Sequence, residues 1–139
     1  MKKLIYLQLL LVILMMQATA QTKEVNWMVQ VHKTIIVDSV LTNSSIALTK
    51  SKLKHKLIVQ CLITNNKTDW QRQIIVMNQQ RQELLKEALC NQQFCISIED
   101  LKAITKGENF SIYSIHLPTN PEEAKRVRIA PIKIASFTW

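Results

Sequence analysis

The chain has 139 residues, with 18 lysines and arginines against 10 aspartates and glutamates and a formal net charge of +8. This length is enough for one domain with its own hydrophobic core and too short for two, which excludes a multidomain enzyme. The basic balance favours anionic partners or surfaces without choosing among them.

The N-terminus has the three parts of a secretory signal peptide. Lys2-Lys3 is followed by an apolar run from Leu4 to Met16, and then Ala18-Thr19-Ala20 places small residues before a cleavage point. A run of about 13 apolar residues is shorter than the roughly 20 that a membrane-spanning helix needs. We therefore expect removal of residues 1–20, an extracytoplasmic location (secreted or periplasmic), and a single domain over 21–139 without a transmembrane span. The MKK opening is typical of a bacterial signal peptide.

Short stretches with alternating apolar and polar residues recur along the domain, which is the period of a half-buried strand. We predict strands over residues 25–31, 34–41, 70–77, 94–98 and 110–117, and a last strand over 127–137 that is interrupted at Pro131. Polar turns separate these stretches. The stretch at 110–117 is apolar on both faces and is therefore expected at the centre of a sheet.

The stretch from Lys50 to Asn65, KSKLKHKLIVQCLITN, combines the clearest core signal with the clearest charge signal. One face of a strand here would be apolar, from Leu53 to Ile63. The other face begins with four lysines: Lys50, Lys52, Lys54 and Lys56. A strand of this length would span roughly 50 Å, well beyond the usual size, so we expect a break near residues 51–54 with the lysines at the entry of the strand.

The row of four lysines has two interpretations. Lysines on an open strand edge prevent edge-to-edge aggregation. Alternatively, a row with a spacing of about 7 Å matches an anionic envelope partner, such as an acidic glycan, lipid headgroups or an envelope protein. Nucleic acid is a poorer partner, because no exposed aromatic residues are interleaved with the lysines.

Residues 78–89, NQQRQELLKEAL, are compatible with two structures. Asn78 can cap a short helix over 79–89, because strong helix formers and one apolar stripe follow it. Alternatively, Gln79 and Gln80 form the tip of a hairpin whose return strand is 82–87.

Seven or eight short strands with at most one helix predict a mainly β fold, an antiparallel β-sandwich. Gly107, the only glycine, is expected to supply a positive φ at a turn.

The run from Ile98 through Asp100-Leu101 and Gly107 to Phe110-Ser111-Ile112-Tyr113 resembles the E to F corner of immunoglobulin-like and fibronectin type III-like domains. That resemblance implies a crossing between two sheets, with Phe110 or Tyr113 as the corner aromatic. The Cys to Trp to Cys spacing of a true immunoglobulin domain is absent.

Three cysteines remain in a compartment that permits disulfides. Cys61 lies on the apolar face of its predicted strand, where a buried free thiol is expected. Cys90 and Cys95 are then the predicted disulfide, whose six-residue loop would stabilise the fold by roughly 2 kcal/mol. No metal site or cofactor is expected, because the cysteine spacing is unusual for a metal site and no histidine is close.

The sequence contains no catalytic motif. Its three histidines, His32, His55 and His116, lie in or beside predicted strands, without a nucleophile elbow, a zinc motif or a phosphate loop. We therefore expect a non-catalytic binding or adhesion-type module; the alternative is a small secreted enzyme or enzyme inhibitor with a site assembled from scattered residues. A deep pocket that joins a histidine to a carboxylate would favour the enzyme, and a flat surface with lysines would favour the module.

Overall fold

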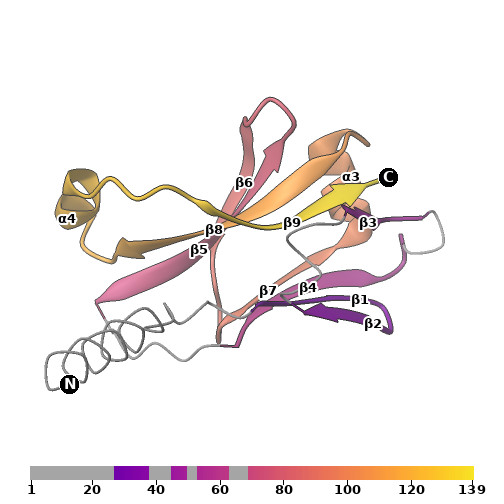
Figure 1. Cartoon of the computed structure of the whole chain (residues 1–139), viewed down its shortest axis with the longest axis horizontal. Helices are drawn as coiled ribbons and strands as arrows, with labels where there is room; N and C mark the ends of the chain where they lie inside the picture. The colour runs from indigo at the N-terminus through magenta and orange to yellow at the C-terminus, as the bar shows by residue number, and fades with distance from the viewer. Residues whose placement is uncertain (1–26, 38–44, 50–52, 63–68) are drawn as a thin grey trace, which may run out of the picture.

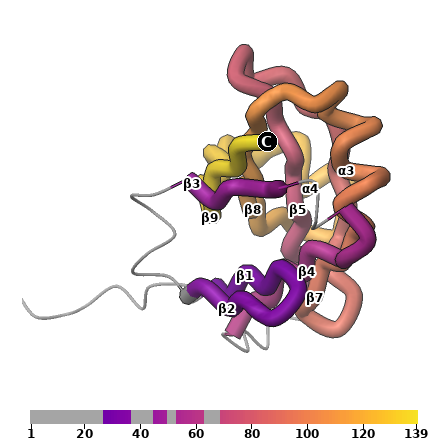
Figure 2. The backbone as a smooth tube through the Cα atoms, turned by 90° about the vertical axis from the view of Figure 1, so that its right-hand side faces the viewer, coloured from indigo at the N-terminus to yellow at the C-terminus, as the bar shows by residue number. Residues whose placement is uncertain are grey.

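Two β-sheets face each other and form a sandwich (Figure 1). The structure is a computed structural model that describes residues 27–37, 45–49, 53–62 and 69–139. The predicted signal peptide lies outside the described residues. Within them, nine strands and two short helices confirm the predicted mainly β sandwich. Figure 2 shows the two layers nearly edge-on, with the helix α3 beside them.

The four-stranded sheet, here called sheet A, has the order β2-β1-β4-β7 and is antiparallel throughout. Its strands are β1 (Trp27–Val31), β2 (Thr34–Val37), β4 (Lys56–Cys61) and β7 (Gln93–Ser97). The alternation predicted for β4 is present, because Leu57, Val59 and Cys61 are buried while Lys56 is exposed. A turn at residues 53–55 precedes the strand, so the expected break is also found.

The five-stranded sheet, here called sheet B, has the order β3-β9-β8-β5-β6. Its strands are β3 (Ser45–Ala47), β5 (Trp70–Asn78), β6 (Glu83–Ala88), β8 (Phe110–Pro118) and β9 (Ile132–Thr138). The strand β8 is central, as predicted. The short pair β3 and β9 is parallel, so a purely antiparallel sandwich was wrong at this edge.

The inner faces of the two sheets share one core. Its fully buried large side chains are Phe137, Leu57, Ile74, Ile98, Leu101, Ile112, Val29, Val31, Val59 and Val76. Phe110 stacks on Phe137, with ring centroids 4.8 Å apart. The predicted strand over 127–137 begins only after Pro131, because proline lacks the N–H that a strand ladder needs.

The helix considered for residues 79–89 is wrong, and the hairpin alternative is confirmed as β5 and β6. Asn78 closes this hairpin instead of capping a helix. Its Oδ1 accepts a hydrogen bond from the Gln82 N–H at 2.9 Å, and its Nδ2 donates to Gln82 Oε1 at 2.9 Å. Arg81 takes the left-handed conformation, with φ 62°, that three-residue hairpin loops use at this place.

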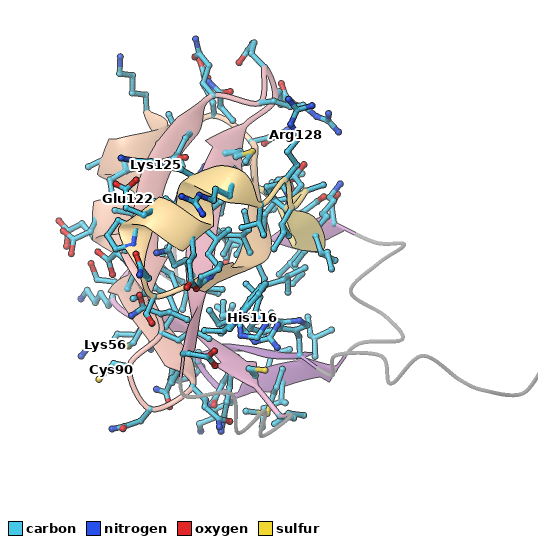
Figure 3. All side chains as sticks on the ribbon, turned by 90° about the vertical axis from the view of Figure 1, so that its left-hand side faces the viewer. Lys56, Cys90, His116, Glu122, Lys125 and Arg128 are labelled. Atoms are coloured by element: carbon cyan, nitrogen blue, oxygen red, sulfur yellow. The ribbon has the colours of Figure 1, made fainter. Side chains whose placement is uncertain are left out.

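Two helices were not predicted. α3 (Ile98–Thr105) carries the chain from sheet A to sheet B, and Ser97 Oγ caps it by accepting from the Asp100 N–H at 3.0 Å. α4 (Pro121–Arg126) joins β8 to β9; Asn120 Oδ1 caps it, and an ion pair at 3.0 Å links Lys125 to Glu122 (Figure 3). Both starts carry cap residues followed by acidic residues, so the signal was present in the sequence.

Candidate anion-binding surface

Two turns lie at one end of the sandwich, and the second of them, with the first residue of β4, holds the described part of the predicted lysine row. The β1 to β2 turn is His32-Lys33, and the turn before β4 contains Lys54-His55. In Figure 1 both turns lie at the end where α3 and the C-terminus also lie. Of the four predicted lysines, Lys50 and Lys52 are outside the described residues.

Lys54 and Lys56 do not form the regular row that a long strand would give. Lys56 is the first residue of β4, but Lys54 lies in the preceding turn, so a spacing of about 7 Å along one face does not extend to it. The chain bends because the His55 carbonyl accepts a hydrogen bond from the Ile98 N–H at 3.0 Å, which ties the turn to the start of α3.

The register of sheet A adds a third lysine. Val31 pairs with Leu57, so the turn that follows Val31 lies beside the residues that precede Leu57. Lys33 thereby joins Lys54 and Lys56, and all three side chains are exposed. We call these three lysines, together with His32 and His55, the basic cluster.

His32 and His55 are in direct contact at the centre of the basic cluster. Their ring centroids lie 3.8 Å apart, with an angle of 34° between the ring planes. The pKa of His32 is lowered from its usual 6.5, first by desolvation of the ring and then by the charges of His55 and Lys33. His32 is exposed overall, so the desolvation arises where its ring is covered by His55. The neutral imidazole is therefore favoured at neutral pH.

Within the described residues, no ion pair neutralises the three lysines of the basic cluster. The first turn of α3, whose Ile98 N–H bonds to the His55 carbonyl, contains the acidic residues Glu99 and Asp100. Asp100 lines the same groove as Lys56, yet no ion pair joins them. Figure 3 shows Lys56 pointing outward from the margin of the sandwich. The cluster therefore presents its charge to solvent.

Two hollows, the first of which includes Lys56 in its lining, are relevant to the enzyme alternative. A groove of about 610 Å³ between β4, β6, β7 and α3 contains Glu87, Asp100 and Cys95 in its lining, but no histidine. A cavity of about 190 Å³ between the sheets is lined by His116 and Arg72, but by no carboxylate. Neither hollow joins a histidine to a carboxylate among the described residues, as the enzyme alternative requires.

No disulfide joins any of the three cysteines in the structure. Cys61 is 2% exposed, as expected, while Cys90 and Cys95 are exposed. Cys90 pairs with Gln93 across a tight turn, which makes Cys95 its diagonal neighbour on the same face. Diagonal Cβ atoms lie about 7 Å apart, whereas a disulfide needs about 4 Å. The Cys90 to Cys95 disulfide stays a prediction, and forming it requires the turn to move.

The described residues hold no group of three or more histidine, cysteine or acidic side chains that could bind a metal ion. No helix in this part of the chain is long and apolar enough to cross a bilayer. No protein-family model matches the chain, and searches of curated proteins and of solved structures find no match. Function therefore has to be argued from the chemistry of the basic cluster.

Proposed function

We propose that this protein is an exported, non-catalytic binding module whose basic cluster contacts anionic surfaces of the cell envelope. Export is supported by the signal-peptide pattern of residues 1–20. The observation that carries the proposal is that the β1 to β2 turn, the turn before β4 and the first residue of β4 bring Lys33, Lys54 and Lys56 together, with no described carboxylate in an ion pair with any of them.

The position of β4 in sheet A weakens the other interpretation of the lysines, in which they prevent edge-to-edge aggregation. A lysine guards against aggregation when it lies on an edge strand with open backbone groups. β4 is an inner strand between β1 and β7, and Lys56 pairs with Ser97 of β7. Lys56 therefore does not protect an open strand edge, and its exposed charge is better explained by an anionic partner.

The expected binding is modest and sensitive to salt. Each lysine near an anionic lipid surface contributes about 1 kcal/mol. Three lysines would then contribute about 3 kcal/mol, which corresponds to roughly 100-fold in affinity. Exposed charges are screened within about 10 Å at 0.1 M salt, so binding should be tested at low ionic strength.

A charge-neutralising variant tests the proposal. The triple variant Lys33→Gln, Lys54→Gln and Lys56→Gln should bind vesicles containing phosphatidylglycerol roughly 100-fold more weakly than the unmodified protein, as measured by co-sedimentation at low salt. Its melting temperature should be nearly unchanged, because the three side chains are exposed and form no ion pair in the described structure.

A matched control removes the same charge from strands β6 and β9 of sheet B and from the segment that precedes β9. Lys86, Arg128 and Lys133 are exposed, and their replacement by glutamine should leave most of the binding intact. Equal losses in both triple variants would show that net charge alone drives adsorption. Full binding by the first variant would contradict the proposed function.

A further inference from the structure

The contact between His32 and His55 is not used by the proposed function, although both residues belong to the basic cluster. Surface lysines alone do not need two imidazole rings in contact at 3.8 Å between centroids. The contact joins the β1 to β2 turn to the turn before β4. It therefore holds together the two segments that carry the three lysines.

We infer that His32 and His55 are a proton-switched part of the anion-binding surface, and that as imidazolium ions they bind the phosphate groups of anionic lipid headgroups together with the neighbouring lysines. This inference rests on the proposed function and adds its regulation. Because the pKa of His32 is lowered from 6.5, the switch operates below that pH.

The charged groups around His32 and His55 explain why protonation of the rings favours binding of an external anion. Lys33 and Lys54 lie on the same two turns as the histidines, and Lys56 follows His55 as the first residue of β4. From α3 come Glu99 and Asp100, and Glu87 of β6 lines the same groove as Lys56. None of these described carboxylates is ion-paired with either histidine. Two added protons would therefore increase a positive charge that a phosphate group can compensate.

The chemistry of imidazolium fits a phosphate oxygen. A neutral imidazole has one N–H donor, whereas the protonated ring has two, and charged donors form the stronger hydrogen bonds to phosphate. Ile35 of β2, which is 56% exposed, adds an apolar side chain near the β1 to β2 turn. Basic residues beside an exposed aliphatic side chain favour a lipid surface over a soluble glycan.

The direction of the pH effect follows from linkage. An anion that prefers the protonated rings binds more tightly as the pH falls, because protonation and anion binding favour each other. Without the anion, the lowered pKa of His32 works against the folded state: stability is fully present above pH 6.5 and is lost as the pH falls through the lowered value. Phosphate should therefore raise the melting temperature more at pH 5.5 than at pH 7.5.

Vesicle binding at two pH values tests the inference. At constant low ionic strength, the unmodified protein should bind phosphatidylglycerol vesicles about tenfold more tightly at pH 5.5 than at pH 7.5. The double variant His32→Gln and His55→Gln should bind equally at both pH values, with the affinity that the unmodified protein shows at pH 7.5. His116→Gln, in a cavity between the sheets, should keep the pH response.

The possible results separate this inference from the proposed function. Binding by the unmodified protein that is equal at both pH values would overturn the switch and leave the proposed function intact. Absence of vesicle binding at both pH values would overturn both. A pH response with heparin but not with vesicles would show that the anion is a sulfated glycan and overturn the lipid assignment. Circular dichroism of each variant at pH 5.5 must show the folded spectrum. If phosphate raised the melting temperature of the double variant more at pH 5.5 than at pH 7.5, that result would also contradict the switch.

Discussion

Single residues in this chain adopt a backbone conformation that is usually left to glycine. Among the described residues, a positive φ is found at His32, Arg81, Asn91, Gln92 and Lys106. The only glycine, Gly107, also has a positive φ of 71°, as the sequence indicated. A left-handed conformation costs a residue with a Cβ about 1 to 2 kcal/mol. The turns of the sandwich are therefore less stable than glycine would make them.

The end of α3 is the clearest place to measure that cost. The Gly107 N–H donates to the Lys102 carbonyl at 3.1 Å and the Lys106 N–H to the Ala103 carbonyl at 3.4 Å, the pattern of a Schellman motif. Lys106 occupies the left-handed position with φ 54°. We expect Lys106→Gly to raise the free energy of unfolding by about 0.5 to 1 kcal/mol, as measured by urea denaturation.

Gly107→Ala is the matched variant and should act in the opposite direction. An added Cβ would meet no atom closer than Lys102 Cε at 4.0 Å, so the expected loss of about 1 kcal/mol is conformational and not steric. Destabilisation by Lys106→Gly would show that the lysine side chain, and not its backbone conformation, matters at this helix end.

At the scale of elements, alternation predicted most strands because each has one face toward the core. Alternation predicted the structure less well where local propensity favours one structure and tertiary contacts favour another. Residues 83–88 contain strong helix formers, yet Leu84 and Leu85 pack against the core from a strand. The parallel pairing of β3 with β9 joins segments far apart in the chain, and no local pattern specifies such a pairing.

The β5 to β6 hairpin depends on Asn78, which leads to a test at this scale. Asn78→Ala removes the two side-chain hydrogen bonds to Gln82, both at 2.9 Å, and should lower the free energy of unfolding by about 1 kcal/mol. Gln79→Ala, at the exposed tip, should change it by less than about 0.5 kcal/mol. A gain in stability with a stronger helical circular dichroism signal would favour the helix over the hairpin.

At the scale of the whole molecule, the candidate surface was only partly visible in the sequence. Lys54 and Lys56 stand out because their charges follow one another along the chain. Lys33 joins them only through the pairing of β1 with β4, and the contact of His32 with His55 arises from the same pairing. A binding surface built from two turns requires the fold before its residues can be grouped.

The thiols report on the integrity of the sandwich as a whole, because Cys61 lies inside it and the other two lie on its surface. In the reduced, folded protein two thiols should react with a neutral reagent, and Cys61 should react only after unfolding, because it is 2% exposed. After mild oxidation, peptide mapping should join Cys90 to Cys95 and leave one thiol. The closed loop should then stabilise the protein by roughly 2 kcal/mol or less, because the turn between them must move.

Two results would contradict this expectation. A peptide that links Cys61 to either surface cysteine would mean that the inner face of β4 is accessible, which the buried core of sheet A does not permit. Disulfide-linked dimers in place of an internal loop would mean that Cys90 and Cys95 stay too far apart to pair. Since both thiols are exposed, that second outcome would make them reactive sites between molecules under oxidising conditions.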